Sequence, residues 1–247
     1  MNKQRLVKAI MAALVLGSVY GSSAFAATIV APGTSESSVN KSITVGEGTE
    51  VKDLGTVNGS IRVGDNAAAD DVETVNGAIR FGDNARADSV ETVNGRIEAG
   101  NGFVASGNLE TVNGSIRLGK GASVMGNVET VNGGIELVQS EVRRDVKMVN
   151  GSMEVRGSHV GGNLQTTTGG IELTDGSVVD GDILIKKPRG NWGWSWGKKK
   201  GPTVVIGANV EVKGRIIVEN EDTKLFIDPS AKVGGVEGIQ AQTLAER

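Results

Sequence analysis

The stretch "VETVNGAIRFGDNARADSVETVNGRIEAG", residues 72–100, contains one phrase twice and decides the fold. The phrase "VETVNG" begins at Val72 and again at Val90, so the repeating unit is 18 residues long. A strand followed by a crossover helix and a return strand takes about 30 residues or more, which this unit cannot hold. A unit of 18 residues fits one coil of a solenoid built from short strands and sharp corners.

The repeat extends in both directions from this stretch. Apolar and polar residues alternate within each unit, as Ile61, Arg62 and Val63 do, which predicts strands rather than helices. The aliphatic ladder comprises Ile43, Ile61, Ile79, Ile97, Ile116, Ile135, Met153 and Ile171. We therefore predict an all-β fold, a single-stranded parallel β-helix (β-solenoid) with 18–19-residue coils.

The Asn-Gly pair is expected to form one corner of every coil, because both residues accept a left-handed backbone. Stacked asparagines can also hydrogen-bond through their side-chain amides from coil to coil. We predict a structural Asn ladder, with a polar binding row as the alternative. Its members are Asn58, Asn76, Asn94, Asn113, Asn132 and Asn150, and Thr168 takes the same place in "TTGG".

Four segments are expected along the chain. Residues 1–26 are expected to be a signal peptide. They have a basic start, an apolar stretch shorter than a membrane span, and "AFA" before the expected cleavage point. We expect residues 27–42 to be an irregular entry segment, residues 43–237 to be the solenoid, and residues 238–247 to be a tail or cap. The signal predicts export to the periplasm or the extracellular space.

Composition limits how the fold is stabilised. The chain has no cysteine, so no disulfide can form, although an exported protein would permit one. Aromatic residues make up only 3% of the sequence, which predicts a thin core of small aliphatic side chains.

The outward positions carry charge in two columns. One column runs through Arg62, Arg80, Glu98, Arg117, Glu136, Glu154 and Glu172, and the other through Glu73, Glu91, Glu110, Glu129, Lys147 and Gln165. Stacked glutamates repel one another, and we expect arginines across the corner, such as Arg80 near Glu73, to relieve this. A solvated face with loose ion pairs is favoured over a cation column. We predict no metal site and no cofactor.

The segment "RGNWGWSWGKKKG", residues 189–201, departs from the repeat. Ile185 ends one strand and Val204 begins the next, so residues 186–203 are expected to replace an Asn-Gly corner with a protruding loop. Its predicted contact residues are Trp192, Trp194, Trp196, Lys186, Lys187, Arg189, Lys198, Lys199 and Lys200. Exposed tryptophans with basic neighbours suit envelope lipid or polysaccharide. Export argues against nucleic acid, and rings folded back as a hydrophobic lid are the structural alternative.

The residue types needed for catalysis are sparse. The single histidine, His159, is expected at the surface or at a corner. Asp175, Asp180 and Asp182 lie close together in the sequence, and turn residues are the simpler interpretation. Glycosidases need paired carboxylates at a fixed separation, usually in a local break of the repeat. We predict no catalytic residues and no enzyme activity.

Two resemblances follow from these patterns, covering about residues 40–235. The opening stretch resembles the secreted bacterial β-strand-repeat proteins grouped as adhesins, whose function is mostly unassigned. "SVVDGDILIKKP" (177–188) and "GANVEVKGRIIVENEDTKLFIDPSAKVGG" (207–235) are similar to bactofilins, polymer-forming β-helical cytoskeletal proteins of the cytoplasm. Both imply a β-helical fold, and neither implies catalytic residues. The export signal departs from the bactofilin pattern.

Together these observations predict an exported, non-enzymatic structural or adhesive protein of the cell envelope. The first alternative is a secreted filament-forming scaffold that self-associates through the solenoid ends. The second alternative is a carbohydrate-active β-helix enzyme.

Overall fold

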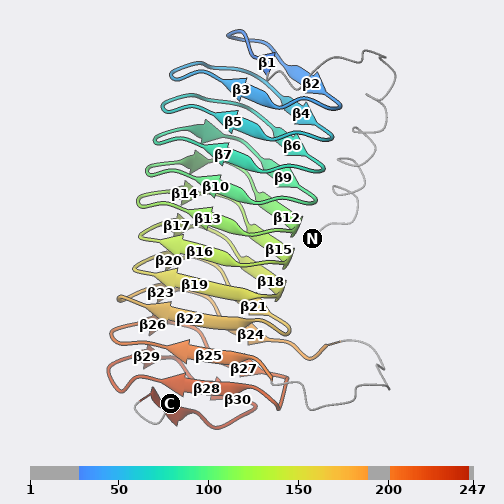
Figure 1. Ribbon diagram of the computed structural model, residues 1–247. Coiled ribbons are helices and arrows are strands. Elements are labelled where there is room, and N and C mark those ends of the chain that lie inside the picture. The colour runs from blue at the N-terminus through green and yellow to red at the C-terminus, as the bar shows by residue number, and fades with distance from the viewer. Residues whose placement is uncertain (1–27, 189–200, 245–247) are drawn as a thin grey trace, which may run out of the picture.

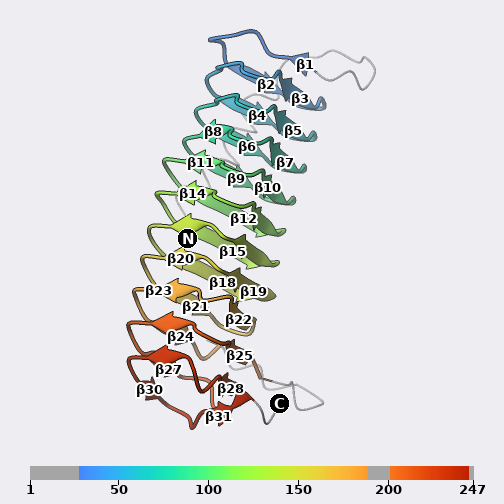
Figure 2. The ribbon, with the colours of Figure 1, turned by 90° about the vertical axis from the view of Figure 1, so that its left-hand side faces the viewer.

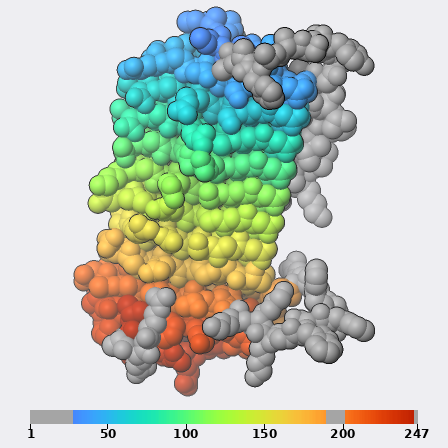
Figure 3. All heavy atoms as spheres, viewed as in Figure 1, coloured from blue at the N-terminus to red at the C-terminus, as the bar shows by residue number. Residues whose placement is uncertain are grey.

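The chain folds into a rod of stacked coils, and the short strands of each coil pair in parallel with those of the neighbouring coils (Figure 1). The computed structural model describes residues 28–188 and 201–244. The predicted all-β solenoid is confirmed: the strands form three parallel sheets, here called A, B and C. Coils follow one another in chain order from one end of the rod to the other (Figures 2 and 3).

Sheet A holds the strand that follows the Asn-Gly corner in each coil. Its register places equivalent residues of successive units side by side, as in Ile61 beside Ile79 and Ile97 beside Ile116. Its twelve strands are β1 (Thr28–Ile29), β3 (Ile43–Val45), β5 (Ile61–Val63), β7 (Ile79–Phe81), β10 (Ile97–Ala99), β13 (Ile116–Leu118), β16 (Ile135–Val138), β19 (Ser152–Arg156), β22 (Gly170–Thr174), β25 (Thr203–Ile206), β28 (Lys224–Ile227) and β31 (Gln242–Thr243).

Sheet B holds the strand that precedes the Asn-Gly corner. Its eleven strands are β2 (Glu36–Ser38), β4 (Leu54–Thr56), β6 (Val72–Thr74), β9 (Val90–Thr92), β12 (Leu109–Asn113), β15 (Val128–Asn132), β18 (Val146–Asn150), β21 (Leu164–Thr166), β24 (Ile183–Ile185), β27 (Ile216–Val218) and β30 (Val236–Glu237). Three of them extend to the asparagine itself, so the ladder of backbone hydrogen bonds there reaches into the corner.

Sheet C lies between the other two in the path of each coil and has the shortest strands. Its eight strands are β8 (Arg86–Ala87), β11 (Val104–Ala105), β14 (Ser123–Val124), β17 (Glu141–Val142), β20 (His159–Val160), β23 (Val178–Val179), β26 (Glu211–Val212) and β29 (Lys232–Val233). A coil therefore runs from A to C to B and turns through the Asn-Gly corner into the next coil, as β7, β8, β9 and β10 do.

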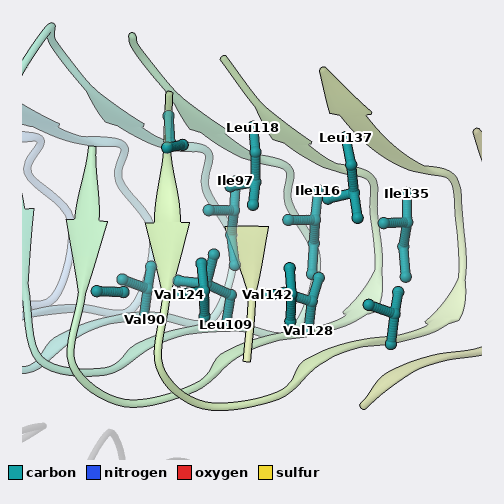
Figure 4. Packing of buried hydrophobic residues seen from close by; sticks show 14 of the residues in the cluster. Val90, Ile97, Leu109, Ile116, Leu118, Val124, Val128, Ile135, Leu137 and Val142 are labelled. Atoms are coloured by element: carbon teal, nitrogen blue, oxygen red, sulfur yellow. The ribbon is translucent and has the colours of Figure 1, made fainter. Parts of the chain in front are cut away.

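The core is a continuous column of aliphatic side chains between the three sheets. Alternation places every second residue of a strand inside, because successive side chains of a strand point to opposite faces. Ile97, Ile116 and Ile135 lie side by side in a row along the rod, with at most 1% of each residue exposed (Figure 4). One aromatic pair interrupts the aliphatic column, where the rings of Phe81 and Phe103 lie 4.7 Å apart.

The segments expected to flank the solenoid contain strands that belong to it. In residues 27–42, expected to be irregular, β1 pairs with β3 and β2 pairs with β4. In residues 238–247, β31 pairs with β28. These strands are short and mostly polar, so they lack the apolar alternation that marks the others. Backbone pairing with a preformed neighbouring strand is sufficient to place them.

Candidate functional site

The strands on either side of the predicted loop are β24 and β25, and β25 begins at Thr203, one residue before the predicted Val204. Strand β24 pairs with β21 in sheet B, and β25 pairs with β22 in sheet A, with Ile171 beside Val204. The solenoid therefore continues in register across the loop. Of the predicted contact residues, Lys186 and Lys187 are described. Arg189, Trp192, Trp194, Trp196, Lys198, Lys199 and Lys200 lie outside the described residues.

Both ends of this loop are fixed to the rod. The Lys186 N–H donates to the carbonyl of Thr166 at 2.8 Å, which continues the sheet B ladder by one residue. The Lys187 N–H donates to a Glu219 carboxylate oxygen at 3.3 Å. On the return side, the Pro202 carbonyl accepts the N–H of Lys224 at 2.9 Å. The loop thus leaves and rejoins a rigid framework.

The asparagines of the Asn-Gly corner form an unbroken hydrogen-bonded ladder along the rod. Each Nδ2 donates to the Oδ1 of the preceding coil's asparagine at 2.8–3.0 Å. The rungs are Asn40, Asn58, Asn76, Asn94, Asn113, Asn132 and Asn150, and the Thr168 hydroxyl contacts Asn150 at the far end. Asn40 is an additional rung that the sequence did not reveal, because "VNK" lacks the glycine of the repeated phrase.

The glycine of this corner serves close approach rather than a left-handed turn, which corrects the expectation from sequence. A Cβ on Gly95, Gly114 or Gly133 would lie 1.8 Å from the carbonyl oxygen of the glycine one coil earlier. The backbone of Gly151 alone among the repeated Asn-Gly pairs has a positive φ, 135°. Coils therefore touch through bare backbone at this corner, and any side chain would separate them.

The buried threonine of each "TVNG" phrase hydrogen-bonds to the corner glycine of the preceding coil. The Thr92 hydroxyl donates to the Gly77 carbonyl at 3.1 Å, and the Thr111 hydroxyl donates to the Gly95 carbonyl at 2.9 Å. Each glycine carbonyl lies where the corner bends away from the regular ladder. The buried threonine thus gives each part-buried glycine carbonyl a hydrogen-bond partner.

The other two corners carry ladders of their own, which sequence reasoning missed. At the corner between sheets C and B, a side-chain oxygen accepts the backbone N–H of the equivalent residue one coil later, as Asn108 Oδ1 does from Asn127 at 2.9 Å. This ladder continues through Asp145, Asn163, Asp182 and Arg215. At the corner between sheets A and C, Asp65, Asp83, Asn101 and Lys120 are linked in the same way.

The outward column of sheet A is a chain of ion pairs between neighbouring coils. Arg80 Nε lies 2.7 Å from Glu98, and Arg117 Nε lies 2.6 Å from Glu136. The expected partner of Arg80 was Glu73, but Arg80 lies on sheet A and Glu73 on sheet B, so register selects Glu98 instead. Such half-exposed pairs each contribute little to stability.

The outward column of sheet B stacks four glutamates, Glu73, Glu91, Glu110 and Glu129, and then Lys147. Burial raises the pKa of Glu73, and the nearby carboxylates of Asp71 and Asp53 add to this effect. Lys147 Nζ lies 3.4 Å from Glu129 and 2.9 Å from Asp145. Burial opposes the charge on Lys147, but its contacts with Asp145 and Glu129 outweigh this and raise its pKa.

The polar residues considered for catalysis take part in surface contacts. His159 is exposed on β20, with Nε2 2.9 Å from Asp180, and Lys213 Nζ lies 2.8 Å from the same carboxylate. Hydrogen bonds from Lys213 and His159 lower the pKa of Asp180. Asp182 belongs to the ladder of the C–B corner, and Asp175 has a left-handed backbone with φ of 56°.

Within residues 28–188 and 201–244, no three histidine, aspartate or glutamate side chains gather closely enough to hold a metal ion. The same residues contain no helix long and apolar enough to cross a bilayer. No protein family, curated protein or solved structure matches this chain.

Proposed function

We propose that this chain is an exported, non-enzymatic structural or adhesive protein of the cell envelope. In this proposal the solenoid is a rigid scaffold, and the loop at residues 186–203 is its contact site for envelope lipid or polysaccharide. Residues 1–26, which predict a signal peptide, support export but lie outside the described residues.

The observation that carries the proposal is the placement of this loop. The register of sheets A and B is continuous on either side of it, and its ends are held by Thr166, Glu219 and Lys224. The regular pairing of the coils therefore resumes on both sides of the loop. Binding residues are commonly carried on loops that a rigid scaffold positions. Lys186 and Lys187 make its first flank basic, and the sequence that follows contributes three tryptophans and four further cations.

The non-enzymatic part of the proposal is supported by the roles of the polar residues. Asp180 is engaged by Lys213 and His159 at the surface, and Asp182 accepts a backbone N–H at 2.8 Å. The carboxylates of Asp180 and Asp182 therefore have structural partners within the solenoid.

The test is co-sedimentation of the full chain with anionic phospholipid vesicles and with purified envelope polysaccharide. We expect binding by the parent, and loss of binding in the triple variant Trp192→Ala, Trp194→Ala, Trp196→Ala. Lys52→Ala with Lys232→Ala is the control, because both lysines are exposed on coils away from the loop. Unchanged binding by the triple variant would contradict the proposal. A loss of thermal stability with unchanged binding would show that the tryptophans act as a lid.

A second candidate function, a secreted filament-forming scaffold, is favoured by the ends of the rod. Sheet A ends at β1 and β31, and sheet B ends at β2 and β30, so among the described residues these strands have one unpaired edge. Ile29 on β1 is 81% exposed. Open edges are templates for pairing with another chain. Electron microscopy of the purified protein distinguishes this candidate, since filaments would form and would survive the triple tryptophan variant.

A further inference from the structure

The outward-facing column of sheet A changes sign along the rod. Strands β5 and β7, towards the N-terminal end, each carry an arginine at its central outward position, and β16, β19 and β22 each carry a glutamate there (Figure 1). Between these two groups β10 carries Glu98 and β13 carries Arg117. The outer face of sheet A therefore has a basic half and an acidic half.

Like charges lie side by side towards both ends of this column. Arg62 is beside Arg80, and Glu154 is beside Glu172. Such neighbours repel one another. The inner charges have partners within the chain, as Arg80 has in Glu98. Arg62 and Glu172 are exposed, and neither side chain forms an ion pair or a hydrogen bond within residues 28–188 and 201–244.

A second copy of the chain, turned end over end, brings opposite charge to both halves of the face. A twofold axis that runs along the strands between β10 and β13 sets β5 opposite the β19 of the partner copy, β7 opposite its β16, and β10 opposite its β13. Each charge of the column on these six strands then faces its opposite. The facing pairs are Arg62 with Glu154, Arg80 with Glu136, and Glu98 with Arg117. Contacts of this reciprocal kind define a twofold interface.

The two unpaired charges come together in the same arrangement. Strand β22 of one copy faces β3 of the other, so Glu172 lies one coil step, about 4.8 Å, from the strand that carries the Arg62 of the partner copy. An arginine side chain spans such a step, and it would lie between Glu154 and Glu172 of the facing copy. The association therefore gives partners to charges that lack them in the single chain.

Side-chain sizes on the face follow the same symmetry. Along the flank nearer sheet C, the N-terminal half has glycines where the C-terminal half has larger residues. The twofold axis sets them opposite one another, Gly46 with Thr174, Gly64 with Arg156, and Gly82 with Val138. Along the flank nearer the Asn-Gly corner, every strand from β3 to β22 has serine, alanine or glycine, except that Arg96 precedes β10 and faces Ser115. Two copies can therefore approach to the distance of packed sheets, about 10 Å.

We infer that the outer face of sheet A is the interface of a homodimer in which two rods lie side by side and run in opposite directions. Parallel rods would set Arg62 against Arg62, and a polyanion would be repelled by the acidic half. The eight strands from β3 to β22 cover about 34 Å by about 13 Å, or about 450 Å² of each copy, which fits a weak, reversible dimer. The inference goes beyond the proposed function, and it uses a sheet face rather than the open ends of the rod.

The first test is sedimentation equilibrium of the full chain at micromolar and higher concentrations. We expect a monomer–dimer equilibrium that weakens as salt is raised. Arg62→Glu should weaken association at least tenfold, because twofold symmetry places the repelling glutamate in the interface twice. Adding Glu154→Arg exchanges the two charges and should restore most of the affinity. A defect in folding would not be rescued in this way.

The second test uses the absence of cysteine from the chain. Ser60 and Ser152 face each other across the antiparallel interface but lie five coil steps, about 24 Å, apart within one chain. The pair of changes Ser60→Cys and Ser152→Cys should give covalent dimers with a short bismaleimide. Ser60→Cys alone should give none, whereas parallel rods would cross-link through it.

The controls separate this inference from the other proposals. Arg144→Glu makes the same charge change at the corner between sheets C and B, across the rod from sheet A, and should leave the dimer unchanged. The triple tryptophan variant should dimerise as the parent does, whatever it binds. The inference is overturned if the full chain stays monomeric at low salt, if Arg62→Glu associates as tightly as the parent, or if Ser60→Cys alone cross-links as well as the pair.

Discussion

Replacing Gly133 by alanine should weaken the rod far more than the same change at the adjacent Gly134. A Cβ on Gly133 would lie 1.8 Å from the Gly114 carbonyl oxygen, whereas one on Gly134 would lie 3.4 Å from its nearest atom, the Ser152 carbonyl oxygen. The first contact is impossible without separating two coils, and the second is an ordinary van der Waals distance. The two sites therefore form a matched pair that differs in close approach alone.

The magnitude follows from the hydrogen bonds that such a separation would disrupt. Around this contact Thr130 Oγ1 donates to the Gly114 carbonyl at 2.9 Å, the Gly114 N–H donates to the Asn132 carbonyl at 3.0 Å, and the ladder amides join Asn132 to Asn113. At about 1 kcal/mol each, their loss would reduce the free energy of unfolding by about 3 kcal/mol. Gly134→Ala should stabilise by about 0.5 kcal/mol, because alanine restricts the unfolded chain.

Urea unfolding followed by circular dichroism measures both changes. Because coils contact mainly their neighbours, transitions in stacked repeats can lose cooperativity, so the midpoint and slope of each variant should be compared with those of the parent. Equal midpoints for Gly133→Ala and Gly134→Ala would refute the argument that bare backbone contact determines this corner.

Three further predictions concern side chains. Asn113→Ala removes two hydrogen bonds of the Asn ladder, at 2.8 and 3.0 Å, and should lower the free energy of unfolding in urea by about 1–2 kcal/mol. An unchanged free energy of unfolding would mean that the ladder does not stabilise the fold. Glu73→Gln should raise stability at neutral pH, because the raised pKa of Glu73 means that folding disfavours its charged form. This gain should disappear as the pH falls through that raised pKa towards the ordinary value of 4.5, and a gain that persists in acid would contradict the assignment. Lys147→Met removes the ammonium beside Glu129, whose side chain is 9% exposed, and should lower the free energy of unfolding by about 2 kcal/mol. Adding Glu129→Gln removes the unpaired charge and should restore most of that stability, as measured by thermal melts.

The fold could be predicted from the sequence because its period is visible at several positions at once. Ile61, Ile79 and Ile97 recur with the spacing of a coil, and the structure places them side by side with none of their surface exposed. The strands β1 and β2 escaped prediction because their pairing rests on backbone groups, which every residue has. The apolar pattern that reveals the other strands is missing from "ESS".

The corners were harder to predict than the strands. A column of identical asparagines is visible in the sequence, but the ladder through Asn108, Asn127, Asp145 and Asn163 mixes two residue types that serve equally well as acceptors. The role of Gly95 could not be deduced, since contact between coils depends on the spacing of their backbones.

The Asn-Gly ladder also bears on how long the protein survives chemically. In a flexible chain this dipeptide deamidates, because the glycine nitrogen attacks the asparagine side-chain carbonyl carbon and expels ammonia. The resulting cyclic imide takes up water and opens to aspartate or isoaspartate. Here every inner amide is held on both sides at 2.8–3.0 Å, and the nitrogens of Gly114 and Gly133 already donate to the next coil. Stacking therefore protects a sequence that would otherwise decay, and a rod that loosens should lose its amides first where its coils have come apart.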